Sequence, residues 1–225
     1  IYLGLQDWEI NENANTNHSY SNFKNWLYSK LVRKAVKDIL GEDAELAHSY
    51  GDIHIHKLPD SLWILYCSGW DYKKILEKGL KTPTLVSSPA KHYDTAISHL
   101  INFFFIAAQE TTGASAVTMF DLYTGVFAQA GQLERDKIRQ GLQTMLFELN
   151  YPARSGLQSP FTNITITLDT VKDYLDEPAI MGGKRVGVLG DYMDGAVKVT
   201  EELMDLYLHG DAKHQPFTFP IPTIM

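Results

Sequence analysis

The sequence TNITITL, at residues 162–168, decides the predicted fold. Its threonines and isoleucines alternate with a period of two, which is typical of a β-strand. Residues 134–149 and 191–208, on either side of it, carry apolar side chains at helical spacing. Because strands that alternate with helices form parallel sheets joined by crossover connections, this arrangement predicts an α/β fold.

The alternation of helices and strands extends toward both ends of the chain. Residues 93–112 form a predicted helix whose apolar stripe is wide enough to indicate burial against more than one neighbour or against a second subunit. Residues 118–127 fit a strand or a loop, and Gly182 and Gly183 mark a loop. The other expected elements are helices at 22–40 and 71–79, strands at 52–58 and 217–221, and a connector at 81–90.

The composition indicates a globular protein. The chain has 225 residues, of which 44% are hydrophobic, so it can bury a core as one large domain or two small ones. A net charge of -7 argues against a nucleic-acid-binding face, because such faces neutralise many phosphates with basic side chains. A single cysteine excludes an internal disulfide and a four-cysteine zinc site, and it predicts a reduced thiol in the cytoplasm.

The two ends of the chain show no membrane or targeting segment. No apolar run has the length of a membrane helix, and residues 1–10 lack the pattern of a signal peptide, so we expect no membrane association. The sequence begins without methionine and ends in the strand-like phrase PFTFPIPTIM at residues 216–225. We therefore expect the chain to be part of a longer protein.

Two histidines are placed together by the predicted strand at residues 52–58. Its period of two puts His54 and His56 on one face. Such a pair binds zinc or iron when a third ligand joins it, and His48 and Asp52 are candidates. The pair is equally able to hydrogen-bond a ligand or buried carbonyls, and we expect this second role, with no metal.

Cys67 lies among aromatic residues, with Tyr66 before it and Trp70 after it. In such a setting a thiol is most often a small core residue. Hydrogen-atom transfer is an alternative role, because it needs no thiolate and therefore no basic neighbour. An apolar, water-poor pocket also suits a radical.

Polar side chains gather before the central predicted strand, in RSGLQSPFTN at residues 154–163. Gln158, Ser159 and Asn163 offer donors and acceptors that suit a sugar or a base edge, although an ordinary turn uses the same residue types. Lys91 precedes the predicted helix at 93–112, where it either meets an anion at the helix N-terminus or is simply an exposed charge.

Five phrases of the sequence resemble one family in the same order. They are ENANTNHS at 12–19, AHSYGDIHIHKL at 47–58, YCSGW at 66–70, RSGLQSPFTN at 154–163 and QPFTFPIPT at 215–223. The family is that of the anaerobic, class III ribonucleoside triphosphate reductases, and the resemblance runs from about residue 7 to the last residue. Its specificity comes from the shared order, because any one phrase alone is weak.

The resemblance implies an oxidoreductase that reduces ribonucleotides to deoxyribonucleotides in a ten-stranded α/β barrel made of two five-stranded halves. In this family a glycyl radical generates a thiyl radical that takes the 3′ hydrogen of the ribose, and a second cysteine helps remove the 2′ hydroxyl. Cys67 matches that second, catalytic cysteine. The other matches are to substrate-binding positions, at His54, His56, Gln158, Ser159 and Asn163.

Cofactors and partners also follow from the resemblance. The family implies a radical-SAM activase that installs the glycyl radical, formate or a thiol protein as reductant, and a structural zinc outside this segment. It further implies allosteric control by dNTP and ATP effectors at the interface of a homodimer. The helix at 93–112 is then the expected dimer surface and Lys91 the expected effector contact.

The sequence also departs from the family. Lys57 stands where the family usually has aspartate, and the chain lacks a second cysteine, a glycyl-radical segment, a zinc module and an N-terminal ATP cone. We therefore expect residues 1–225 to be one partial domain, the N-terminal half of the catalytic barrel, and inactive in isolation. Two alternatives stay open: a non-catalytic, nucleotide-binding half of a split enzyme, and a metal hydrolase that uses His54 and His56.

Overall fold

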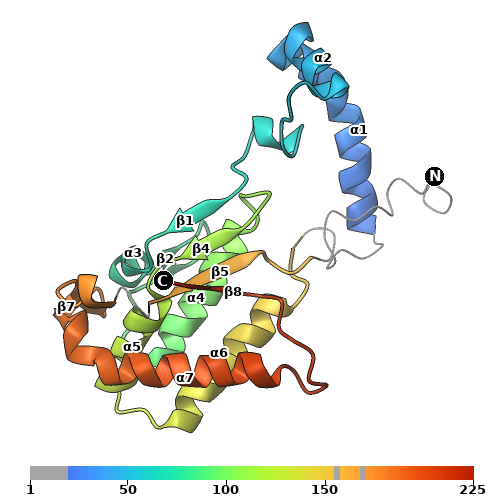
Figure 1. Ribbon diagram of the computed structural model, residues 1–225. Helices are drawn as coiled ribbons and strands as arrows, with labels where there is room; N and C mark the ends of the chain where they lie inside the picture. The colour runs from blue at the N-terminus through green and yellow to red at the C-terminus, as the bar shows by residue number, and fades with distance from the viewer. Residues whose placement is uncertain (1–19, 155–157, 168–170) are drawn as a thin grey trace.

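The computed structural model describes residues 20–154, 158–167 and 171–225, in which helices alternate with short strands (Figure 1). The helices are α1 (Tyr20–Leu40), α2 (Glu42–Tyr50), α3 (Tyr72–Lys78), α4 (Tyr93–Ala107), α5 (Phe120–Ala130), α6 (Arg135–Asn150) and α7 (Met193–His209). The strands are β1 (Ser68–Trp70), β2 (Leu80–Lys81), β3 (Val86–Ser87), β4 (Ser115–Val117), β5 (Thr162–Ile166), β6 (Pro178–Met181), β7 (Lys184–Val188) and β8 (Ile221–Ile224). None of the described helices is long and apolar enough to cross a membrane.

A parallel sheet is the centre of the fold. Its strands follow the order β1-β4-β5-β8, and each neighbouring pair is parallel. The connections carry α3 and α4, then α5 and α6, then α7, and these helices lie on one side of the sheet (Figure 1). The predicted α/β class with crossover helices is therefore confirmed. The described sheet has four strands, whereas the resemblance implied five in each half-barrel.

The helices that cover one face of the sheet pack closely against one another. Helices α5 and α7 meet at Gly125 and Gly195, where an added Cβ on either glycine would overlap backbone atoms of the other helix. Helices α6 and α7 are joined by ion pairs between Arg135 and Arg139 on one side and acidic residues of α7 on the other. Because both glycines sit at a point of backbone contact, larger residues there would separate the helices.

Several predicted elements have different bounds in the structure. The helix expected at 93–112 ends at Ala107. Its wide apolar stripe is buried against α3, α5 and α6, which agrees with the predicted burial against more than one neighbour. Residues 118–127, predicted as strand or loop, lie mainly in helix α5. The last strand was predicted too early, because the backbone N–H groups of Thr218 and Phe219 donate to Oδ1 of Asn150, at 3.1 and 3.0 Å, and strand pairing starts at Ile221.

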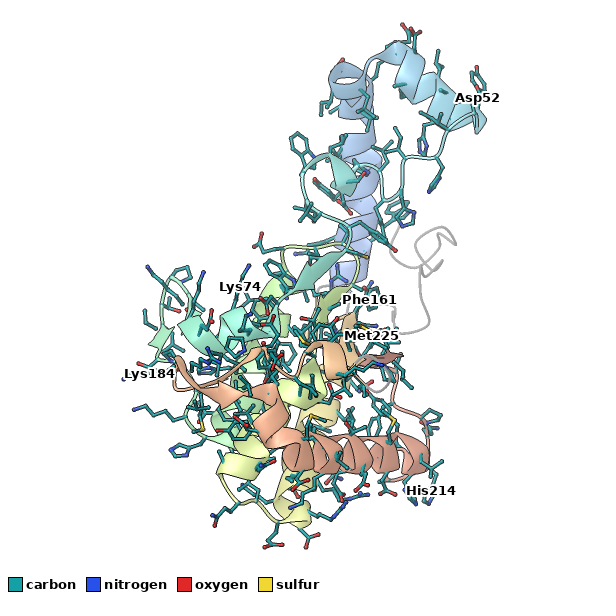
Figure 2. All side chains as sticks on the ribbon, turned by 60° about the vertical axis from the view of Figure 1, so that its left-hand side comes forward. Asp52, Lys74, Phe161, Lys184, His214 and Met225 are labelled. Atoms are coloured by element: carbon teal, nitrogen blue, oxygen red, sulfur yellow. The ribbon has the colours of Figure 1, made fainter. Side chains whose placement is uncertain are left out.

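An arm formed by α1 and α2 extends from the amino-terminal edge of the sheet. In Figure 2, Asp52 lies at the far end of this arm, whereas Phe161 lies at the end of the sheet from which the arm projects. Helix α2 buries none of its side chains, and Leu31 of α1 is 61% exposed. The arm therefore contributes little to the described core.

Asp121 is a carboxylate buried between α5 and the end of β5. Its side chain is 1% exposed, and Oδ2 accepts the backbone N–H of Thr167 at 2.9 Å. Oδ1 has no partner among the described residues. Burial raises the pKa of Asp121 from 3.8 to about 6, although backbone N–H donors oppose the shift.

Asp121→Asn should remove a pH-dependent cost of folding. A carboxyl with a raised pKa stabilises the fold at low pH and loses that contribution as the pH rises from 3.8 to about 6. The asparagine oxygen can still accept from Thr167 but does not titrate. The free energy of unfolding of the variant relative to wild type should rise by about 2 kcal/mol between pH 4 and pH 7.

Denaturant melts at a series of pH values would measure this difference, with Asp38→Asn on the exposed surface of α1 as the control. Parallel pH profiles for wild type and Asp121→Asn would contradict the assignment of this cost to Asp121.

Candidate active site

The parallel sheet has a face covered by helices and a face that is open in the described part of the chain (Figure 1). Val117 and Ile164 point toward the helices and are fully buried. Successive side chains of a strand point to opposite faces, so Gly69, Ala116 and Asn163, which share one register position, lie on the open face. Two of these three residues have little or no side chain, and the open face is therefore accessible at its centre.

Cys67 lies at the amino-terminal edge of this open face. It directly precedes β1, is exposed, and by strand alternation lies on the same side as Gly69. Its Sγ accepts the backbone N–H of Ala114 at 3.3 Å. The interpretation of this thiol as a core residue is wrong, because β1 is an edge strand and the described residues do not cover it.

Gly113 fits closely against the thiol. Its backbone N–H donates to the carbonyl of Tyr66 at 2.5 Å. A Cβ on Gly113 would lie 2.8 Å from Sγ of Cys67 and 2.5 Å from the Tyr66 carbonyl oxygen. The absence of a side chain at this position therefore allows the segment before β4 to support Cys67.

A row of residues crosses the open face beside the thiol. Ser68, Ser115 and Thr162 are paired in register, so the residues before them, Cys67, Ala114 and Phe161, form a neighbouring row. The guanidinium of Arg154 lies over the ring of Phe161, 5.3 Å from its centroid.

Asn163 lies next to this row on the open face, and its Nδ2 donates to Oγ1 of Thr223 at 2.8 Å. A thiol, an amide and a guanidinium are thus presented around a floor of small residues. Such an arrangement can hold a polar ligand and react with it.

The predicted histidine strand at residues 52–58 is wrong. Gly51 ends α2 in the left-handed conformation, and the N–H groups of Asp52 and Ile53 donate to the carbonyl of Ala47. These donors are used by the helix end and do not pair with a strand. Lys57, with a φ of 57°, interrupts an extended backbone as well.

The two histidines nevertheless lie together, on the loop between the arm and β1. Nε2 of His54 is 3.2 Å from Nδ1 of His56, and the His56 ring packs edge-on against Tyr66 with 4.4 Å between centroids. Nδ1 of His48 accepts the backbone N–H of Ile55. Because Tyr66 precedes Cys67, the histidines lie to one side of the thiol.

The histidine cluster gives no support to the metal alternative. Among the described residues, no group of three or more His, Cys, Asp or Glu side chains is arranged to hold a metal ion. The ring nitrogens of His48, His54 and His56 that have assigned partners bond to each other or to the backbone.

Gln158 and Ser159 lie before β5, at the same edge of the sheet as Cys67. The hydroxyl of Ser159 is buried and donates to the carbonyl of Asn150 at 2.7 Å. The carbonyl of Gln158 accepts the backbone N–H of Arg154 at 2.9 Å. Gln158 and Ser159 thus make hydrogen bonds to Arg154 and Asn150. Their predicted contacts with a substrate stay predictions.

Lys91 is remote from the open face. It is exposed just before α4, on the helix side of the sheet, and its stem lies against the turn at Gly182. Farther along α4 a hollow of about 830 Å³ separates this helix from the β2–β3 hairpin. His99 lines it, bonds to Oγ of Ser87 at 2.7 Å, and has a pKa lowered by burial.

Sequence reasoning missed residues that shape the site. Arg154 was quoted only as part of a polar phrase, and the small residues Gly113, Ala114 and Ala116 were not singled out. The available signal was the run TTGASAV at 111–117, whose small side chains follow a helix and continue into strand β4. Small residues in a strand mark a place where another group approaches closely.

The comparisons agree with the resemblance drawn from the sequence. The family model of the anaerobic ribonucleoside-triphosphate reductases matches residues 12–225. A search of curated proteins gives no match.

Among solved structures, the anaerobic ribonucleotide reductase of Thermotoga maritima with dATP bound in the specificity site is 26% identical, with a TM-score of 0.69. The match covers 89% of this chain and 36% of that one. The same enzyme in complex with dATP and CTP is 25% identical, with a TM-score of 0.70, over 91% of this chain and 36% of that one. With citrate in the active site it is 26% identical, with a TM-score of 0.69, over 89% of this chain and 38% of that one. The chain thus spans little more than a third of the length of these structures.

Gly113→Ala should displace Cys67, whereas Gly69→Ala should not. An added methyl at Gly113 would overlap Sγ and the Tyr66 carbonyl, while the described residues leave open space at Gly69. We expect Gly113→Ala to cost about 1–3 kcal/mol of stability, as overpacking usually does, and to alter the alkylation rate of Cys67. Thermal melts and mass spectrometry of the iodoacetamide-labelled Cys67 peptide measure the two effects, and equal behaviour of the two variants would contradict the proposed support by Gly113.

Proposed function

Because the chain belongs to the family of anaerobic ribonucleoside-triphosphate reductases, we propose that the complete protein reduces ribonucleoside triphosphates to deoxyribonucleoside triphosphates. In this proposal residues 1–225 form the N-terminal half of the catalytic barrel, with the open face of the sheet toward the substrate. The observation that carries the proposal is the exposed thiol of Cys67 at the edge of that face.

Cys67 acts as the hydrogen donor on the ribose face from which the 2′ hydroxyl leaves. The backbone N–H of Ala114 occupies one acceptor position of its sulfur, which leaves the S–H group available to a ligand on the open face. Hydrogen transfer from a thiol needs no prior ionisation. The one hydrogen bond described for Sγ of Cys67, from the backbone N–H of Ala114, is therefore compatible with this role.

The remaining radical machinery is proposed to lie outside these residues. Cys67 is the only cysteine of the sequence, so a reaction that uses two cysteines must take the other from elsewhere. The same holds for the glycyl radical, its radical-SAM activase and the structural zinc. The reductant, formate or a thiol protein, acts at the same open face.

His54, His56 and Asn163 are proposed to bind the substrate around Cys67. Asn163 lies on the open face, and the histidines approach from the side of Tyr66. Gln158 and Ser159 contribute by holding the loop before β5. These contacts orient the ribose, while the small side chains of the sheet leave space for it.

Allosteric control is proposed to act on the other side of the sheet. Lys91, near the N-terminus of α4, contacts a phosphate of a dNTP or ATP effector, and the complete protein is a homodimer with this side at its interface. The exposed positions along α4 and the adjacent hollow support this placement. The relative with dATP in its specificity site shows that such a site exists in that protein.

Cys67→Ser in the complete protein should abolish deoxynucleotide formation while the glycyl radical still forms. The hydroxyl keeps the shape of the thiol but is a poor hydrogen-atom donor. Product analysis measures the first effect and electron paramagnetic resonance the second. Ser68→Ala is the matched control, because Ser68 bonds to Ser115 on the helix side of the sheet, 3.1 Å between hydroxyls, and it should retain activity.

Full turnover by Cys67→Ser would overturn the proposed role. Nucleotide binding without any reduction by the wild-type complete protein would instead favour the non-catalytic alternative.

A further inference from the structure

Arg154 lies beside one end of the row formed by Cys67, Ala114 and Phe161. Its guanidinium covers the ring of Phe161, and Ala114 stands between Phe161 and Cys67 in the sheet. Neighbouring strands are about 4.8 Å apart, so the backbones at Phe161 and Cys67 are separated by about 10 Å. The alanine between them adds only a methyl group, and a ligand can therefore extend from the guanidinium toward the thiol.

Arg154 is held in place but keeps an unused donor. Its Nη2 donates to the carbonyl of Thr111 at 2.5 Å, and Thr111 pairs with Leu65 on the segment that leads to Cys67. Its Nη1 is buried and has no hydrogen-bond partner among the described residues. A buried charged donor without an acceptor is costly, so this nitrogen requires an acceptor in the working protein.

The charges around Arg154 favour an anion as that acceptor. Lys57 and Asp60 are its charged neighbours, and all three side chains are partly buried. Burial lowers the pKa of Lys57 and of Arg154, the positive charge of Arg154 lowers that of Lys57 further, and burial raises the pKa of Asp60. No salt bridge joins Arg154 to Asp60 or to another carboxylate in the described part of the chain, so the charge of the guanidinium is not neutralised there.

Two surface arginines, Arg135 and Arg139, show the contrast. Arg135 and Arg139 lie on the surface between α6 and α7, and their guanidinium groups pair with carboxylates of α7. Their charge is satisfied within the fold. Arg154 differs because its described hydrogen bonds go to a carbonyl, which does not neutralise it.

We propose that Arg154, assisted by Lys57, forms an anion subsite at the amino-terminal edge of the open face, which binds a carboxylate or phosphate group of a ligand beside Cys67. This inference rests on the proposed function and adds the chemical class of ligand recognised at its site. Two sources supply such a group: a small carboxylate reductant and the triphosphate of the substrate. Guanidinium binds both through paired N–H donors.

Calorimetric titration of the complete protein with sodium formate, and separately with CTP, tests the subsite without requiring turnover. Arg154→Gln removes the charge and retains a polar side chain of similar reach. Loss of a charge-assisted pair should weaken binding of the anion about 10-fold to 100-fold. Arg135→Gln is the matched control, because its guanidinium already pairs with Glu201 and Glu202, and it should change binding less than about twofold.

The two titrations distinguish the sources. Weaker binding of formate alone assigns the subsite to a carboxylate, weaker binding of CTP alone assigns it to the triphosphate, and weakening of both assigns a shared site. Unchanged binding of both in Arg154→Gln overturns the proposal. Lys57→Met, at a less buried position, should weaken the same ligand about threefold to tenfold, and it keeps the test decisive if Arg154→Gln does not fold.

Failure of the subsite and failure of the proposed function give different results. If Cys67→Ser abolishes reduction while Arg154→Gln binds both anions normally, the proposed function is supported and the proposed anion subsite is wrong. If Cys67→Ser turns over fully, the proposed role of the thiol is wrong, whereas the anion titrations still test the subsite at Arg154.

Discussion

The parallel register of β1, β4, β5 and β8 is the constraint on which the site depends. Because each connection places its helices on the same side, one face of the sheet is buried and the other stays open. The register then sets which residues meet on the open face, since neighbours in adjacent strands point the same way. A shift of one residue between β1 and β4 would turn Cys67 toward the helices and separate it from Ala114.

Small residues convert this open face into space for a ligand. Gly69, Ala114 and Ala116 occupy its centre, and Gly113 permits the close contact of the β4 segment with Sγ of Cys67. The thiol and the guanidinium lie at the edge of this floor, and Asn163 shares the register position of Gly69 and Ala116. The site is thus defined as much by the absence of side chains as by the functional groups that surround it.

Local patterns in the sequence predicted those elements whose hydrogen bonds are local or whose burial is regular. The alternation in TNITITL gave β5, and Asp71 caps α3 by accepting the N–H of Lys73 at 3.0 Å, close to the predicted start of that helix. The strand predicted at residues 52–58 is wrong because alternating side chains do not show which acceptors the backbone N–H groups bind. Here those donors are taken by the carbonyl of Ala47 at the end of α2.

The position of Cys67 could not be obtained from its neighbours in the sequence for a similar reason. Aromatic residues such as Tyr66 and Trp70 are usually signs of burial, yet Tyr66, before the edge strand β1, and Trp70, at its end, are 45% and 39% exposed. The row from Cys67 to Phe161 joins residues far apart in the chain through strand register, which no local pattern encodes. The residues around Cys67 left a core role and a hydrogen-transfer role open, and the resemblance, which compares whole phrases in order, favoured the second.

The exposed apolar residues around the open face fit a surface that is completed by further protein. Trp63 and Leu65, before β1, are 61% and 66% exposed, and Ile221 and Ile224 of β8 are 50% and 59% exposed. They border the two edge strands of the described sheet, whose unpaired backbone groups are themselves available for pairing. Both features support the proposed half-barrel, because a second half would pair these edges, bury these side chains and enclose Cys67 with Arg154 in a site shielded from water.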